Sequence, residues 1–269
     1  MLGERLRPYV SRADRAVKSL LDRYRDSLFY EPLSEFLQGG KRIRPALLLI
    51  SHEVCGGSGD PEPAAAAVEL IHTASLIHDD LIDHDTSRRG SPAFHVRFGE
   101  TLAILVSDFV LSLVLDVSSL YGDPAVARIL ARTTRTMSEG EAEEAAIRSR
   151  GEKISLNEYL SVLEKKTASL FGAAAELGAV IAGTAREVEG ALAEYGKLVG
   201  LAYQLRDDLM DWGKPGEISS LLDLGAAREL EAMSEDLADR AIELTNTLPE
   251  SPARELLAEL ARFAARWVR

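Results

Sequence analysis

The segment at positions 71–83 reads IHTASLIHDDLID, and its acidic end, DDLID, returns as DDLMD at positions 207–211. Both copies lie within apolar stretches whose spacing is helical. Carboxylates of like charge that gather in apolar surroundings raise one another's pKa and cost free energy. A cation between the two segments removes that cost, so we expect two helices that face each other across a metal ion.

Composition narrows the classes of function. The chain has 269 residues, of which 46% are hydrophobic, and this suffices for a large buried core. Lys and Arg total 31 against 43 Asp and Glu, and the net charge of -12 argues against nonspecific binding to nucleic acid or to anionic membranes. The single cysteine, Cys55, excludes an internal disulfide framework and a cysteine-rich zinc site.

No export or membrane signal stands out in the sequence. The first residues lack the apolar core of a signal peptide. No stretch reaches the roughly 18 uninterrupted apolar residues of a membrane span, and the most apolar candidate, near 102–115, is interrupted by Ser107 and Asp108. We therefore expect a cytoplasmic protein without a transmembrane segment.

Apolar residues recur every three or four positions along nearly the whole chain, which predicts an all-α fold. Three helix starts carry capping signals: Asp60 before Pro61, Asp123 before Pro124, and Ser155 with Glu158. The breaks between helices are too short to be linkers, so we expect one domain over residues 1–269. The expected helices lie near residues 4–28, 42–55, 62–84, 95–119, 124–147, 156–183, 186–212, 224–246 and 252–268.

The two acidic segments have the spacing of a metal site. On a helix Asp79 shares a face with Asp83, and Asp207 shares one with Asp211, whereas the second aspartate of each set lies about 100° round. Such hard oxygen ligands suit Mg²⁺, which completes its octahedron with water and phosphate oxygens. One acidic set alone would more simply be a solvated helix face. Two sets of identical spacing favour a metal.

Basic residues complement the acidic segments. The stretch GGKRIRP at positions 39–45 puts cations at a glycine turn that opens a helix, which is a natural anion site. The run RRG follows at 88–90, and Lys166-Thr167 opens another apolar stretch. Each of these signals is weak alone, because arginine pairs are usually solvated. Together with the carboxylates they predict recognition of a diphosphate bridged by metal ions.

These motifs, in this order, resemble those of the trans-isoprenyl diphosphate synthases, the polyprenyl synthetase family. The resemblance rests on GGKRIRP (39–45), IHTASLIHDDLID (71–83), RRG (88–90), Lys166-Thr167 and YQLRDDLMD (203–211). It implies a single-domain helical bundle with a central active-site cavity. It also implies a prenyltransferase that joins isopentenyl diphosphate to an allylic diphosphate and releases pyrophosphate.

The resemblance further implies a role for each matching residue. Several Mg²⁺ ions, or Mn²⁺ ions, would hold the allylic diphosphate on Asp79, Asp83 and Asp207, assisted by Asp80 and Asp211. Lys166 and Arg88 would contact the same diphosphate and complete the catalytic set. Isopentenyl diphosphate would bind on Lys41, Arg44, His72 and Arg89. Thr167 and Gln204 would orient or shield the allylic cation.

The chain departs from the family pattern after the second acidic motif. The family usually has a longer loop there, with a Gly-Lys-Pro sequence and a further lysine before the next helix. Here Trp212 runs directly into GKPG at 213–216, so we expect a domain shortened by a loop and roughly a helix. Lys214 matches the family lysine in type but not in spacing. The shortening leaves open a slower enzyme or one completed by a partner subunit.

Small residues upstream of the first acidic motif bear on product length. Family members with short products have aromatic plugs at the positions of Ala74 or Ser75, and both residues are small here. We therefore expect a product longer than farnesyl diphosphate, namely geranylgeranyl diphosphate or a longer one. Small residues at these positions also suit close helix packing. The next candidate stops are Ile71, Val68, Phe109 and Leu113.

Two other functions stay open from the sequence. A terpene cyclase uses similar metal-assisted ionisation, but it needs no second diphosphate site, and Lys41, Arg44 and Arg89 argue for one. A noncatalytic subunit of a heteromeric prenyl synthase is the second alternative, and the intact acidic motifs argue against it. Family members are usually homodimers, which the apolar helix faces of this chain permit.

Overall fold

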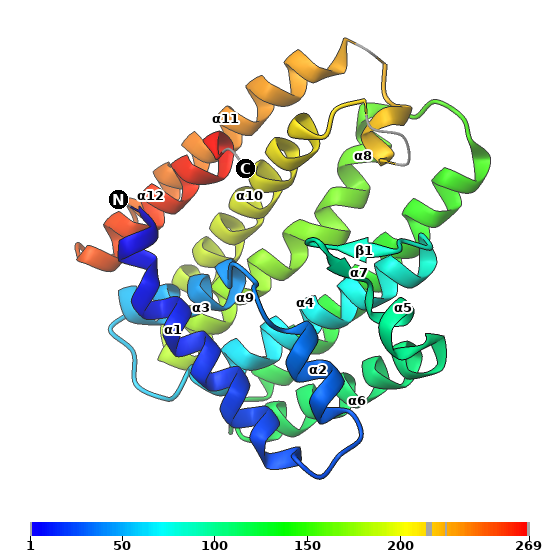
Figure 1. Ribbon diagram of the computed structural model, residues 1–269. Helices are drawn as coiled ribbons and strands as arrows, with labels where there is room; N and C mark the ends of the chain where they lie inside the picture. The colour runs from blue at the N-terminus through cyan, green and yellow to red at the C-terminus, as the bar shows by residue number, and fades with distance from the viewer. Residues whose placement is uncertain (1, 214–216, 224, 268–269) are drawn as a thin grey trace.

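The computed structural model describes residues 2–213, 217–223 and 225–267 and is an α-helical bundle (Figure 1). The first part of the chain forms α1 (Leu2–Leu21), a 3-10 turn (Asp22–Tyr24), α2 (Tyr30–Phe36), α3 (Ile43–Val54) and α4 (Glu62–Ile82). A short antiparallel hairpin, β1 (Ser87–Arg88) and β2 (Ser91–Pro92), precedes α5 (Phe94–Phe98), α6 (Glu100–Ser119) and α7 (Pro124–Arg150).

The second part of the chain continues with α8 (Leu156–Leu163), a π-helical turn (Glu164–Ala168), α9 (Ser169–Ala182) and α10 (Arg186–Met210). After a 3-10 turn (Ile218–Leu221) come α11 (Ala226–Thr245) and α12 (Pro252–Arg266). The all-α prediction is confirmed. Two of the three predicted caps are confirmed, since Asp123 accepts from Ala125 N, and Ser155 and Glu158 form a capping box. The third differs, because Pro61 is the N-cap of α4 and Asp60 precedes it, where its side chain accepts from Glu62 N.

Helices α3 and α4 lie at the centre of the bundle. Residues 46–50 of α3 and 64–68 of α4 are almost fully buried on all sides, as expected of helices surrounded by other helices. Helix α9 lies directly on α3, because a Cβ at Gly178 would come within 2.4 Å of Leu48 O. The buried half of α4 therefore fixes its acidic half, which ends at Ile82.

Three predicted boundaries were wrong. The helix expected over 4–28 ends at Leu21, and α2 was not predicted. The helix expected over 95–119 is divided at Gly99, whose φ of 88° no other residue type adopts easily. Helix α7 runs through the expected break and ends at Gly151, which has a φ of 64° and caps the helix in the left-handed conformation.

The outward face of α6 carries several large apolar side chains together with the exposed Asp108 and Ser112. By length and composition alone this helix could cross a membrane, yet helices of soluble cores pass the same test. Its inner side packs on α4 and α5. The exposed large apolar side chains on or next to α6 are Ile104, Leu105, Leu111, Leu115 and Leu120.

Candidate active site

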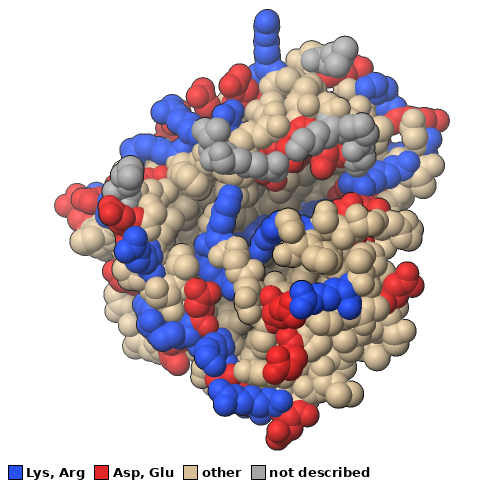
Figure 2. Space-filling view, in the orientation of Figure 1, with Lys and Arg blue, Asp and Glu red and all other residues tan. Residues whose placement is uncertain are grey.

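The acidic ends of α4 and α10 open into one large cavity. Its volume is about 1250 Å³, and its walls come from the start of α3, α4, the hairpin, α7, the π-helical turn and α10. Figure 2 shows the hollow on this face, with Lys and Arg side chains gathered in it. The predicted residues that line it are Lys41, Arg44, His72, Ser75, Asp79, Asp83, Arg88, Arg89, Lys166, Thr167, Gln204, Asp207 and Asp211.

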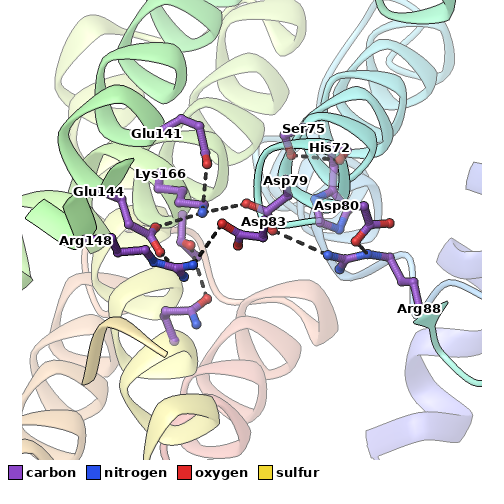
Figure 3. Close-up of polar contacts among 12 residues, drawn as sticks. His72, Ser75, Asp79, Asp80, Asp83, Arg88, Glu141, Glu144, Arg148 and Lys166 are labelled. Atoms are coloured by element: carbon purple, nitrogen blue, oxygen red, sulfur yellow. Dashed lines mark hydrogen bonds and ion pairs between the residues drawn. The ribbon is translucent and has the colours of Figure 1, made fainter. Parts of the chain in front are cut away.

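The ammonium group of Lys166 holds three carboxylates together. Its Nζ lies 2.6 Å from Asp79 Oδ1 and 2.8 Å from one oxygen each of Glu141 and Glu144. Figure 3 shows these groups pointing toward one another from α4 and α7. Burial acts to lower the pKa of Lys166, but attraction to the three carboxylates outweighs burial and raises that pKa. Lys166 is therefore a fixed positive charge on this wall.

Lys166 lies in the π-helical turn, which presses against α7. A Cβ at Gly140 would lie 2.7 Å from Lys165 Cβ and 2.8 Å from Lys166 N, so this contact requires glycine. The extra residue of a π-helical turn changes the direction of the side chains that follow, and such turns are frequent at functional sites. The turn and the glycine together bring Lys166 between Glu141 and Glu144.

A second cation, Arg148, connects α7 to the end of α4. Its Nη1 lies 2.9 Å from Asp83 Oδ1, and its Nη2 lies 2.5 Å from Glu144 Oε1. Burial raises the pKa of Asp83, and Arg148 opposes that rise. The sequence analysis missed Glu141, Glu144 and Arg148. Their spacing of three and four does place them on one helix face, but among neighbouring glutamates that pattern is typical of a solvated face.

Asp80 does not lie where a metal ligand in the cavity would be expected. Its side chain is fully buried and does not line the cavity. Arg88 Nε donates to Asp80 Oδ1 at 2.6 Å, and Arg88 Nη2 lies 3.4 Å from Asp79 Oδ2. The helical offset of about 100° explains this, because it turns Asp80 off the face that Asp79 and Asp83 share. Asp80 orients Arg88, and a role of Asp80 as a metal ligand stays a prediction.

The cavity carboxylates fit a magnesium ion that arrives with phosphate. Asp79, Asp83 and Glu144 belong to one wall, and Asp207 and Asp211 belong to the last turn of α10. Among the residues that the structure describes, no three His, Cys, Asp or Glu side chains are grouped so that they could hold a metal by themselves. Mg²⁺ commonly takes one or two carboxylates and fills its other positions with water and substrate phosphate.

A buried relay orients Gln204. Thr167 Oγ1 donates to Gln204 Oε1 at 3.1 Å, and Gln204 Nε2 donates to Asp208 Oδ1 at 2.7 Å. The hydroxyl of Tyr159, which is fully buried, donates to Asp208 Oδ2 at 2.5 Å. Burial raises the pKa of Asp208 to about 7, and the two hydrogen bonds oppose that rise. Tyr159 was not predicted, because a tyrosine on an amphipathic helix gives no signal beyond that of a core residue.

The opposite wall holds positive charge without carboxylate partners. Arg44 and Arg89 make no ion pair with any residue in the described ranges. Arg44 Nη1 lies 3.1 Å from His72 Nε2, and its guanidinium carbon lies 4.5 Å from the ring centroid of Phe171. Burial lowers the pKa of Arg44 to about 10. Burial and the nearby arginines hold the pKa of His72 well below its usual value, so His72 is neutral and its Nε2 accepts from Arg44.

Arg42 has a structural role within the same motif. It adopts a φ of 52°, and its guanidinium turns back to pair with Glu69 at 2.7 Å and Asp14 at 2.8 Å. A Cβ at Gly40 would lie 2.2 Å from Arg42 Nη1, so the side chain uses space that only glycine leaves. Burial raises the pKa of Glu69, and Arg42 opposes that rise. This buried pair anchors the turn that carries Lys41.

The predicted chain-length positions lie at or beyond the edge of the cavity. Ser75 lines it, whereas Ala74 and Ile71 do not. Phe109 stacks on Phe29, with ring centroids 4.8 Å apart, while Val68 and Leu113 are buried in the core. Their role in product length stays a prediction. Lys214 lies outside the described residues.

Comparison with known proteins identifies relatives over the whole bundle. A family model described as polyprenyl synthetase matches residues 26–218. The geranylgeranyl diphosphate synthase of Methanosarcina mazei is 39% identical over 216 residues, which cover 77% of this chain and 66%, slightly under two thirds, of that protein. A short chain isoprenyl diphosphate synthase of Methanothermobacter thermautotrophicus is 35% identical over 97% of this chain and 85% of that protein.

A solved structure shares the fold. The polyprenyl synthase of Caulobacter crescentus, crystallised with calcium and isoprenyl diphosphate, has a TM-score of 0.87 and 30% identity to this chain. The match covers 98% of this chain and 97% of that chain.

Replacing Arg42 by Met should destabilise the fold by about 3–5 kcal/mol, because Glu69 would be left buried without its partner. Burial already raises the pKa of Glu69, so this carboxyl stabilises the folded state most when it is protonated. That contribution to stability is lost as the pH rises through the folded-state pKa. The loss of unfolding free energy in Arg42→Met should therefore be larger at about pH 8 than at about pH 5. Denaturant unfolding at both pH values measures it.

The matched control for Arg42→Met is Arg97→Met. Arg97 pairs with Glu35, but their side chains are 48% and 40% exposed. Loss of this exposed ion pair should lower the free energy of unfolding by less than about 1 kcal/mol. Equal effects of the two substitutions would contradict the anchoring role of Arg42.

Proposed function

This chain belongs to the polyprenyl synthetase family, and we propose that it elongates prenyl chains. It would transfer the allylic group of an allylic diphosphate to isopentenyl diphosphate and release pyrophosphate. One observation carries the proposal. A single cavity has a carboxylate wall suited to a metal-bound diphosphate and, separately, arginines without carboxylate partners suited to a second anion. An enzyme that joins two diphosphate substrates needs both.

The allylic diphosphate would bind at the carboxylate wall. Mg²⁺ held by Asp79, Asp83, Asp207 and Asp211 would neutralise the charge that develops on the departing pyrophosphate. Lys166 and Arg88 would add positive charge from the protein itself. Lys166 is held at that position before any substrate binds, by its contacts with Asp79, Glu141 and Glu144. Such preorganised charge costs little rearrangement at the moment of ionisation.

Isopentenyl diphosphate would bind at the basic wall. Lys41, Arg44 and Arg89 would take its phosphates, and the neutral His72 would offer a hydrogen bond without adding charge. Thr167 and Gln204 line the cavity with their mutual orientation fixed. Their oxygens would face the developing allylic cation as neutral dipoles. The isopentenyl double bond would attack that cation, and a proton would then leave to the pyrophosphate.

The exposed face of α6 supports a homodimer. Five of the large apolar side chains exposed in the described residues lie on or next to this helix: Ile104, Leu105, Leu111, Leu115 and Leu120. Contiguous patches of this kind mark interaction surfaces in soluble proteins. A second copy presents the same apolar face, so the two can bury each other. We also propose a cytoplasmic location, since the substrates are soluble diphosphates.

Purified protein with Mg²⁺, isopentenyl diphosphate and an allylic diphosphate should yield an elongated prenyl diphosphate. Chelation of the metal should abolish turnover, and Asp79→Asn and Asp207→Asn should each lower kcat by about 100-fold or more, because each removes a ligand that acts in the transition state. Asp239→Asn, on the exposed side of α11, is the control and should leave kcat unchanged.

Product analysis by mass spectrometry distinguishes the alternatives. A cyclised hydrocarbon made without isopentenyl diphosphate would indicate a terpene cyclase, and turnover only with an added subunit would indicate a heteromeric enzyme.

The wild-type product should be geranylgeranyl diphosphate or longer, and Ala74→Phe should shorten it. The added ring would fill the space beyond Ser75, one residue along α4, and stop the growing chain. Reversed-phase analysis of the dephosphorylated products measures the change. An unaltered product profile in an active Ala74→Phe enzyme would contradict this location of the chain-length stop.

The wild-type protein should have the mass of two chains in solution, and Leu111→Glu should reduce it to one. A charged residue in the centre of the apolar face of α6 must lose its hydration if two copies meet there. Thr247→Glu, in the exposed turn after α11, is the control for an added charge elsewhere. Light scattering after size exclusion gives the mass, and a dimeric Leu111→Glu protein would exclude this interface.

A further inference from the structure

An aromatic stack underlies the two cations that open α3. The ring centroids of Phe171 in α9 and Tyr203 in α10 are 6.0 Å apart. Tyr203 in turn stacks on Trp267, with 5.0 Å between the ring centroids and an angle of 8° between the ring planes. Arg44 lies over Phe171 at one end, with 4.5 Å from its guanidinium carbon to the ring centroid. Lys41 lies over Trp267 at the other end, with 3.8 Å from Nζ to the ring centroid.

Two of these rings contact Lys41. Its Nζ donates to Tyr203 Oη at 3.3 Å and contacts the face of Trp267. A lysine ammonium is a mobile point charge on a flexible stem, so a group that holds it lowers the entropy cost of each later contact. The indole face attracts the ammonium by its quadrupole, more strongly when the pair is shielded from water.

Trp267 is itself held firmly. It directly follows α12 and is only 4% exposed, and Arg206 Nε donates to its carbonyl oxygen at 3.2 Å. Its indole nitrogen is buried and has no hydrogen-bond partner in the described part of the chain. The ring is therefore placed by stacking and by its backbone contact. Trp267 also lines the cavity, so it can act on a substrate site directly.

Simple core packing is the alternative explanation of the stack. It would account for buried rings, but it would not require a cation at each end. Phe263 provides the contrast, because it lines the same cavity from α12 and contacts no cation among the described residues. Trp267 and Tyr203 both line the cavity and contact Lys41, and the ring of Trp267 lies nearer to the ammonium, at 3.8 Å against 5.9 Å to the two ring centroids.

We propose that Trp267 is a positioning residue for the second diphosphate site, where its ring holds Lys41 while Phe171 holds Arg44. This inference rests on the proposed function, since it assigns isopentenyl diphosphate to these cations. Trp267 thereby contributes to substrate affinity although it belongs to none of the family motifs. Loss of the ring should weaken binding of isopentenyl diphosphate and leave the allylic site unchanged.

The kinetic test compares Trp267→Leu, Trp267→Phe and Phe263→Leu. In Trp267→Leu the KM for isopentenyl diphosphate should rise roughly 2- to 5-fold, the range expected for a cation–π contact of an exposed lysine. The KM for the allylic diphosphate and the kcat should stay within about twofold. Trp267→Phe retains a ring and should restore most of the affinity, and Phe263→Leu should not raise the KM for isopentenyl diphosphate. A Trp267→Leu enzyme with wild-type KM would overturn the proposal.

A binding test does not depend on turnover. The chain has two tryptophans, so Trp212→Phe leaves Trp267 as the only tryptophan, which can be excited selectively over the tyrosines. Titration with isopentenyl diphosphate alone should change its emission with saturation, as Lys41 shifts toward the phosphates, and Lys41→Gln should remove the change. No response in a folded protein that turns over would overturn the inference while leaving the proposed function intact. A saturable response without turnover would instead support the site and refute the proposed activity.

Discussion

The ion pair between Lys166 and Asp79 is the contact on which the site depends. It joins α4 to the π-helical turn, and Glu141 and Glu144 join the same ammonium to α7. Without this cation, carboxylates from two helices would face each other in a partly buried wall and raise one another's pKa. The positive charge of Lys166 offsets the repulsion between these carboxylates. This explains how the bundle keeps a cluster of acids assembled before a metal or a substrate is present.

The cavity separates charge by wall, although the protein as a whole is acidic. The net charge is -12, yet Arg44 and Arg89 face the cavity without ion pairs in the described residues. Interactions between charges are strong over short distances in a shielded cleft and weak across the solvated surface. The local excess of positive charge therefore decides what binds there, and the surface carboxylates have little influence.

The sequence predicted the fold and the cavity better than it predicted the contacts. Helical spacing alone located Asp79, Asp83, Asp207 and Asp211, because the period of a helix determines which side chains share a face. It put Asp80 only at the margin of that face, and no signal in the sequence indicated its pairing with Arg88. Residues such as Tyr159 could not be found this way, since the partner of its hydroxyl, Asp208, lies 49 positions away. No local pattern encodes a contact between helices that distant in sequence.

Arg42 and Arg44 show why a motif cannot be assigned as a unit. They are two positions apart in one basic stretch, but the left-handed backbone at Arg42 turns its side chain back toward Asp14 and Glu69. Arg44 follows within α3 and points to His72 and Phe171 at the cavity. The first arginine has its charge neutralised in the core, so it stabilises the turn. The second has no carboxylate partner among the described residues, so its charge remains available at the cavity.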